Sequence, residues 1–168
     1  TLRANGITSI NLDLMYGLPY QTVKGVEHNV DVILEMAPDR IALFGYAHVP
    51  WMKTHMKLIN EDVLPGRDER HDQMLAAAEK LMANGYSWIG LDHFAKDEDS
   101  MSVTQRAGKL NRNFQGYTVD PCDALIGLGA SSIGAHPNGY IQNHTPVQDW
   151  RRAIEDGVTP TARGVEIS

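Results

Sequence analysis

The 168-residue sequence contains a single cysteine, Cys122, and it has no long run of apolar residues. One thiol excludes a disulfide within the chain, and it excludes a zinc site or a cluster built from several thiolates of this chain. We expect Cys122 to be a buried or partly buried thiol. Asp, Lys, His or Gly interrupts every apolar stretch, so none approaches the roughly 20 residues that span a bilayer.

Basic residues are also in the minority. The chain has 15 Lys and Arg against 21 Asp and Glu, which gives a net charge of −6. A nucleic-acid or anionic-membrane partner requires a basic face, so neither partner is expected. The first residues fit neither a secretory signal nor a transit peptide, and we expect a cytoplasmic protein.

The two ends of the chain look internal. Residues 1–6 read as the end of a helix that Asn5 and Gly6 close, and the last residues directly follow a predicted helix. We therefore expect further sequence on both sides.

Several common catalytic motifs are missing. The seven histidines show no HExxH spacing, so we expect no protein-bound metal in this segment. No G-x-S-x-G, P-loop or G-x-G-x-x-G pattern occurs. These absences leave the ends of predicted strands as the places to search for a site.

The first clear unit is strand, helix, strand. Apolar and polar residues alternate over 8–14, which predicts a strand with Asp13 on its polar face. Thr22 is a plausible N-cap for a helix that Pro38 ends, and residues 40–47 form an apolar second strand. Short connections in this order predict two parallel strands, as in half of a βα barrel or of a doubly wound sheet. In both architectures functional residues gather at the C-terminal ends of the strands.

The later part of the chain does not continue the regular alternation of strands and helices. We predict a helix over 68–84 with Met82 among its inward residues, and a strand over 86–91. Residues 96–100 read as a solvated charge run, and a short amphipathic helix is expected over 146–155. We interpret the region beyond the strand as a cover rather than as more βα repeats.

Residues in three stretches near the predicted strand ends are considered for a site. Asp13 can accept hydrogen bonds from ribose hydroxyls or an amino group, or it can simply pair with a neighbouring charge. Ala47 is a small residue that lets a flat ring approach the backbone, and His48 beside it is more simply a satisfied histidine in a turn. Asp92 and His93 are adjacent in sequence, and we do not expect Asp92 to orient His93 from the next strand position.

Five stretches resemble the oxygen-independent coproporphyrinogen III oxidase family, a group of radical S-adenosylmethionine enzymes. They are NLDLMYGLP at 11–19, YAHVP at 46–50, GLDHFA at 90–95, RNFQGYT at 112–118 and GLGASSI at 127–133. The first stretch is shared with other radical S-adenosylmethionine proteins, whereas RNFQGYT and GLDHFA are particular to the oxidase.

The resemblance implies an α/β fold: the C-terminal part of a radical SAM partial (βα)6 TIM-like barrel, plus the start of the family's C-terminal region. On this basis residues 1–66 hold the last βα units, 67–145 cap the barrel and carry an active-site wall, and 146–168 begin the C-terminal region. The family's Cys-x3-Cys-x2-Cys loop would lie upstream of residue 1, so the ligands of the [4Fe-4S] cluster are absent from this chain.

The resemblance also implies residue roles. Asp13 and Ala47 correspond to contacts with a second S-adenosylmethionine molecule, and Ile133 to a contact with the cluster-bound one. Gln115 is the candidate for the active-site wall. The implied reaction is oxidative decarboxylation of coproporphyrinogen III to protoporphyrinogen IX in haem biosynthesis, with electrons from an unidentified low-potential donor. Lys109, Arg112 or protonated His93 are candidates to meet the substrate carboxylates, although all three can equally be solvent-facing charges.

Two alternatives stay open from the sequence. A related haem-trafficking protein shares the stretch at 11–19 but lacks this decarboxylation, and an inactive truncated remnant would lack any activity.

Overall fold

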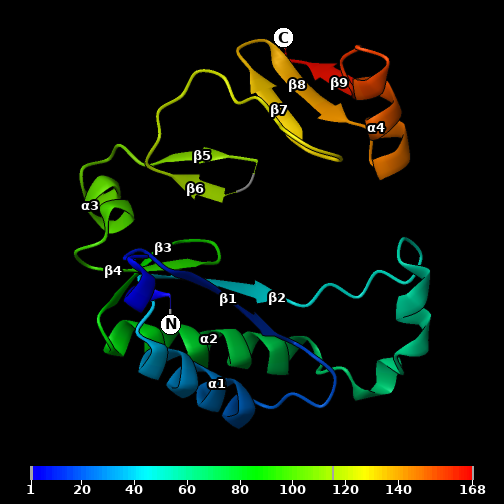
Figure 1. Cartoon of the computed structure of the whole chain (residues 1–168). Helices are drawn as coiled ribbons and strands as arrows, with labels where there is room; N and C mark the ends of the chain where they lie inside the picture. Colours follow the sequence, from blue (N-terminus) through cyan, green and yellow to red (C-terminus); the bar gives the residue numbers. More distant parts are fainter. Residues whose placement is uncertain (1, 115, 168) are drawn as a thin grey trace. The chain divides into compact units, whose positions relative to one another are not determined.

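A computed structural model describes residues 2–114 and 116–167 of the chain. The chain forms two compact units, Thr1–Lys109 and Leu110–Ser168, each of which is considered by itself (Figure 1). The division into segments 1–66, 67–145 and 146–168 remains a prediction about function.

The first unit is a mixed sheet with helices. Its elements in chain order are η1 (Arg3–Asn5), β1 (Asn11–Tyr16), α1 (Val23–Met36), β2 (Arg40–Gly45), η2 (Thr54–Leu58), η3 (Glu61–Val63), α2 (Arg67–Ala83), β3 (Tyr86–Gly90), β4 (His93–Lys96) and α3 (Ser100–Arg106). The strand order is β1-β2-β4-β3. Strand β1 is therefore an edge of this sheet within the described part of the chain.

The predicted strand–helix–strand unit is confirmed. β1 and β2 pair in parallel, with Asn11 opposite Arg40 and Tyr16 opposite Gly45. The Thr22 side chain caps α1 by accepting a hydrogen bond from the Gly25 N–H at 3.2 Å, which satisfies one of the unpaired donors at the helix start. Pro38 follows the end of α1, as expected from its missing N–H.

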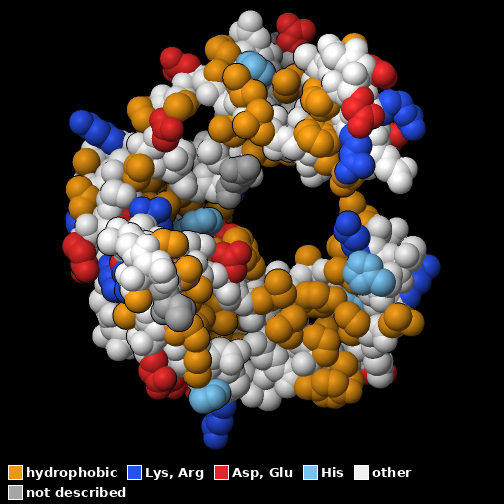
Figure 2. Space-filling model, viewed as in Figure 1, with side chains coloured by type: hydrophobic (Ala, Val, Ile, Leu, Met, Phe, Trp, Pro, Cys, Tyr) orange, Lys and Arg blue, Asp and Glu red, His pale blue; other side chains and the backbone are white. Residues whose placement is uncertain are grey.

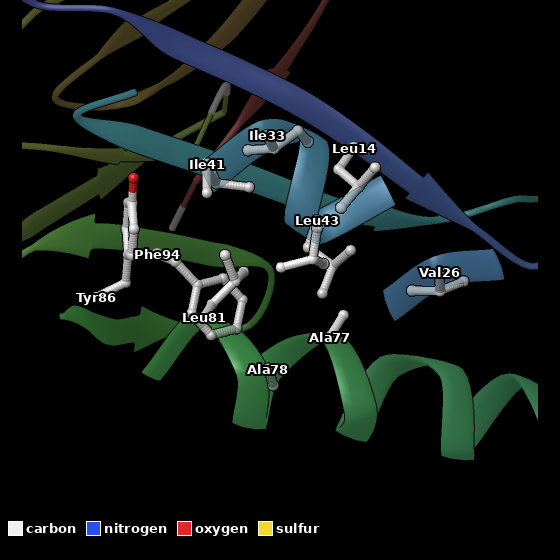
Figure 3. Packing of buried hydrophobic residues seen from close by; sticks show 11 residues of the cluster. Leu14, Val26, Ile33, Ile41, Leu43, Ala77, Ala78, Leu81, Tyr86 and Phe94 are labelled. Carbon is white, nitrogen blue, oxygen red and sulfur yellow. The ribbon is translucent and has the colours of Figure 1, made fainter. Parts of the chain in front are cut away.

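Helices α1 and α2 cover one face of the sheet and form the core (Figure 3). Leu14, Ile41 and Leu43 point to these helices from β1 and β2, and Phe94 does so from β4. Burying one such side chain contributes about 1.5–3 kcal/mol, so this face fixes which residues of each strand point away from the helices. Those residues are Asn11, Asp13, Met15, Arg40, Ala42, Phe44, His93 and Ala95.

The region after β3 differs from the expectation. Residues 93–96 are a strand, β4, which pairs antiparallel with both β2 and β3. The supposed charge run is also not fully solvated, because the Asp99 side chain is only 8% exposed, pairs with Arg40 at 3.0 Å and caps α3. Met82 was predicted to point inward but is 42% exposed, since Gln73, Ala77 and Leu81 make up the buried stripe of α2.

The second unit is built from two small antiparallel sheets and one helix. Its elements are β5 (Asn111–Asn113), β6 (Gly116–Thr118), β7 (Ile133–His136), β8 (Gly139–Asn143), α4 (Val147–Glu155) and β9 (Thr161–Glu166). β5 pairs with β6, and β8 lies between β7 and β9. Helix α4 confirms the expected helix. Strand β9 was not predicted; its sequence TARGVE has no apolar alternation, and all six of its residues are exposed.

Apolar side chains remain on the surface. Figure 2 shows them interspersed with charged groups on the face in view. The largest exposed fractions in the first unit belong to Tyr20 at 80%, Trp51 at 75% and Leu58 at 89%. Among the described residues, no helix combines the length and the apolar character needed to cross a membrane.

Candidate functional site

A buried glutamine on α2 fixes the loop that follows β1. Gln73 is 0% exposed; its Oε1 accepts a hydrogen bond from the Gly17 N–H at 2.9 Å, and its Nε2 donates to the Gln21 carbonyl at 2.7 Å. Gly17 has a φ of +81°, a backbone conformation that side chains disfavour. Sequence reasoning missed Gln73, because a glutamine on a helix usually faces solvent.

Arg70 lies against the C-terminal ends of both parallel strands. Its Nη2 donates to the Tyr46 carbonyl at 2.7 Å. A Cβ added to Gly17 would lie 3.1 Å from the Arg70 Nε, and one added to Gly45 would lie 3.2 Å from its Nη2. The glycines therefore make room for the guanidinium, which ties α2 to this end of the sheet.

Asp13 lies on the face of the sheet that α1 and α2 leave uncovered. It is the third residue of β1, it is exposed, and its Oδ1 accepts a hydrogen bond from Asn11 Nδ2 at 3.0 Å. Its neighbours Leu12 and Leu14 pack toward the helices. An exposed carboxylate in this position can accept hydrogen bonds from hydroxyl or ammonium groups of a ligand.

Ala47 follows β2 by two positions and is also exposed. The register pairs Asp13 with Ala42, five positions before Ala47. Since a strand rises about 3.3 Å per residue, Asp13 and Ala47 are well separated along the strand direction. Asp13 thus lies within β1, whereas Ala47 lies beyond the end of the adjacent parallel strand β2, which corrects the expectation that residue 47 is part of that strand. We predict that both residues face one cavity.

His48 has a hydrogen-bonding partner at each ring nitrogen. Nδ1 lies 3.3 Å from the Tyr46 hydroxyl, and Nε2 lies 3.2 Å from Glu61 Oε1. The side chain is 12% exposed. This pattern fits the structural interpretation of His48 as a satisfied histidine.

The expectation for Asp92 and His93 is wrong. Asp92 Oδ1 lies 2.6 Å from His93 Nδ1, so the carboxylate does orient the imidazole. The expectation assumed successive positions of one strand, whose side chains point to opposite faces. Instead Asp92 lies in the turn between β3 and β4, where Leu91 has a φ of +44° and changes the chain direction. The neighbouring Phe94 is in the helix-facing core, which directs His93 to the other face.

Ile133 begins β7 in the second unit, where it lines a groove of about 310 Å³. The apolar part of the groove comes from Phe114, Tyr140, Ile141 and Val165, and the polar part from Gln142 and Arg163. Asn143 supports the adjoining loop by donating to the Gly129 carbonyl at 2.9 Å. Ile133 is thus set in a surface that can hold an apolar or flat group.

Gln115 lies outside the described residues. Strands β5 and β6 form an antiparallel hairpin in which Asn113 lies opposite Gly116. On this hairpin the Arg112 guanidinium lies 5.6 Å from the centre of the Tyr117 ring, an arrangement that favours a cation–π contact. The roles expected for Gln115 and Ile133 remain predictions.

Cys122 is exposed, which corrects the expectation of a buried thiol. Its Sγ lies 2.8 Å from Asp120 Oδ1, and this hydrogen bond, with the negative charge nearby, raises the pKa of the thiol. Within residues 2–114 and 116–167, no group of three or more His, Cys, Asp and Glu side chains is arranged to hold a metal ion. One cysteine does not fit a [4Fe-4S] cluster, which takes several thiolates.

The donor chemistry does fit a nucleoside-containing cofactor. Asp13 offers an exposed carboxylate for hydroxyl groups, and Ala47 offers an exposed residue without bulk. Contacts of these two residues with S-adenosylmethionine remain a prediction.

Comparisons with known proteins agree on one family. An oxygen-independent coproporphyrinogen III oxidase of Cereibacter sphaeroides is 50% identical over 164 residues, which are 98% of this chain and 36% of that protein. The enzyme of the same name from Bradyrhizobium diazoefficiens is 48% identical over 97% of this chain and 36% of its own length. The chain is homologous to one part of these oxidases.

The solved structures give the same result for the fold. Coproporphyrinogen III oxidase from Escherichia coli, described as a radical SAM enzyme, matches with a TM-score of 0.93 and 35% identity. The match covers 99% of this chain and 38% of the Escherichia coli oxidase. No protein-family model matches the chain. The chain therefore spans little more than a third of the oxidases it resembles.

Proposed function

We propose that the protein containing this chain carries out oxygen-independent oxidative decarboxylation of coproporphyrinogen III to protoporphyrinogen IX. The observation that carries the proposal is 50% identity to such an oxidase over 98% of the chain. In this reaction each of two propionate side chains loses carbon dioxide, one hydrogen atom and one electron, and becomes a vinyl group. The hydrogen atom would pass to the radical derived from S-adenosylmethionine, and the electron to a one-electron acceptor that the proposal includes. The low-potential electron donor and the cytoplasmic location belong to the same proposal.

Two residues of the first unit would contribute cofactor binding. The Asp13 carboxylate would accept hydrogen bonds from S-adenosylmethionine, and Ala47 would leave space beside the β2 end for a flat ring. S-adenosylmethionine bound in the whole protein, together with a [4Fe-4S] cluster for which this chain has no ligand set, would supply the radical that abstracts hydrogen from the substrate.

The second unit would contribute the remaining contacts. Ile133 would pack against the S-adenosylmethionine bound at the cluster, and Gln115 would form part of the active-site wall. The groove around Ile133 is largely apolar, which suits a surface that excludes water from a radical.

Two side chains of α2 fix the backbone near the C-terminal ends of β1 and β2. Gln73 and Arg70 hold the backbone of Gly17, Gln21 and Tyr46 through buried or partly buried hydrogen bonds. Rigid elements position binding groups more accurately than loops do. We infer that this network keeps Asp13 and the β2 end in a fixed relation.

An anaerobic assay of the full-length protein tests the proposal. The protein is reconstituted with iron and sulfide and is given coproporphyrinogen III, S-adenosylmethionine and a reductant. We expect protoporphyrin IX after oxidation of the products, measured by chromatography with fluorescence detection. A protein that carries its cluster and binds haem, but forms no protoporphyrin, would instead be the haem-trafficking relative.

A further inference from the structure

Asp13 and His93 lie in one row across the sheet. Asp13 pairs with Ala42 in the parallel β1–β2 ladder, and Ala42 pairs with His93 in the antiparallel β2–β4 ladder. Residues paired in a ladder point to the same face, so all three face away from α1 and α2. Strands lie about 4.8 Å apart, which places the Cα atoms of Asp13 and His93 about 10 Å from each other.

The His93 ring is held in a defined orientation on this face. Its Nδ1 lies 2.6 Å from Asp92 Oδ1, and its ring meets that of Phe44 edge to face with centroids 6.4 Å apart. The side chain is 17% exposed. Asp92 therefore engages one ring nitrogen, and a second carboxylate placed at Nε2 could accept a hydrogen bond from the other.

The rest of the face supplies little positive charge. Among its strand residues the basic side chains are Arg40 and His93, and Arg40 Nε lies 3.0 Å from Asp99 Oδ1. The Arg40 Nη2 donates to the Ser100 hydroxyl at 3.1 Å. An anionic group that binds beside Asp13 on this face would therefore lie next to the His93 ring.

We propose that His93 binds a propionate carboxylate of the tetrapyrrole substrate and that Asp92 is the positioning residue for its ring. This inference rests on the proposed function, which supplies the substrate, and it adds a substrate-binding residue to that function. In the row of Asp13, Ala42 and His93, His93 would bind the substrate and Asp13 the cofactor. Because Ala42 lies between Asp13 and His93 in the row, the Asp13 carboxylate and a propionate bound at His93 stay apart.

The test compares His93→Gln and Asp92→Asn with the wild-type full-length enzyme. His28→Gln is the matched control, because His28 is exposed on α1, away from this face. Loss of a charge-assisted hydrogen bond should raise the KM for coproporphyrinogen III about tenfold in His93→Gln, with kcat and the KM for S-adenosylmethionine little changed. Asp92→Asn should produce a smaller rise in the same KM.

A double variant separates positioning from general structural damage. If Asp92 acts through His93, adding Asp92→Asn to His93→Gln should cause no further rise in KM. Additive effects would overturn the positioning role. A rise in the KM for S-adenosylmethionine, or a loss of kcat alone, would overturn the assignment to the substrate.

A binding measurement distinguishes this inference from the proposed function. Coproporphyrin III carries the same propionate side chains, and its fluorescence anisotropy reports binding without turnover. We expect about tenfold weaker binding to His93→Gln than to wild type. If wild type binds coproporphyrin III in this way but does not decarboxylate the substrate, the proposed function fails while the role of His93 stands. Equal binding to both proteins would overturn the role of His93. If His93→Gln fails to assemble its cluster, Asp92→Asn decides by the same criteria.

Discussion

The side-chain oxygen of Gln73 accepts a hydrogen bond from the Gly17 N–H at 2.9 Å, and Gln73 is completely buried. Its amide group donates to the Gln21 carbonyl at 2.7 Å. One side chain on α2 thus satisfies two backbone groups of the loop that follows β1. The position of this loop depends on a residue that lies more than 50 positions later in sequence.

Replacing Gln73 with Leu should destabilise the protein markedly. The substitution leaves the Gly17 N–H and the Gln21 carbonyl without this partner, and an unsatisfied buried polar group costs about 1–3 kcal/mol. Urea unfolding of the parent protein should show a lower midpoint. Asp72→Asn changes the exposed residue next to it and should leave the midpoint unaltered. Equal midpoints for both variants would show that water replaces Gln73 without cost.

Asp13→Asn should weaken S-adenosylmethionine binding. The amide is nearly the same size but loses the charge, and hydrogen bonds to a charged group are worth about 1.5–3 kcal/mol, so we expect at least tenfold weaker binding. The measurement is equilibrium dialysis of labelled S-adenosylmethionine with the full-length protein. Asp62→Asn, at an exposed site on η3, is the control. Unchanged binding in Asp13→Asn would withdraw Asp13 from the cofactor site.

The free energy of unfolding should depend on pH through Asp39, whose side chain binds the backbone just before β1. Burial alone would raise the pKa of Asp39, but the Ile10 N–H at 2.8 Å and the Arg3 guanidinium at 3.0 Å lower it, and the net pKa lies below its usual value. A carboxyl whose pKa is lower in the folded state stabilises that state above its unfolded pKa, and this contribution disappears as the pH falls through the folded pKa.

Asp39→Asn should therefore lower the free energy of unfolding at pH 7 by about 1 kcal/mol, the typical net value of a lost hydrogen bond. The difference from wild type should shrink as the pH is lowered below about 4, the ordinary pKa of an aspartate. Unfolding midpoints in urea across this range provide the measurement. A difference that stays constant with pH would mean that the Asp39 charge does not matter.

The 168-residue chain by itself should have no decarboxylase activity and no cluster absorbance after anaerobic reconstitution. It has one cysteine, which cannot hold a [4Fe-4S] cluster, and in the part of the chain that the structure describes β1 is an edge strand, a position that favours self-association. The full-length parent should show both activity and absorbance. A brown preparation of the 168-residue chain with one cluster per molecule would contradict this prediction.

Local sequence signals determined much of the first unit. The alternation at Ile10 to Leu14, the Thr22 cap and Pro38 predicted β1, α1 and the start of β2, because each signal acts over a few residues. The same reasoning predicted α2, β3 and α4. The resemblance in five short stretches indicated the same group of oxidases to which the comparisons show the chain to be similar.

Tertiary structure alone decided the neighbours of each side chain. Strand β4 between β2 and β3, the burial of Gln73 and the approach of Asp92 to His93 follow from pairing and packing between segments far apart in the chain. Strand β9 has no apolar alternation in its own sequence, and it forms through antiparallel backbone pairing with β8. Periodicity specifies which face of an element is buried, whereas the partner on that face depends on how the whole chain folds. For this reason the sequence determined that Asp13 is on a polar face, and the fold decided that His93 shares its row.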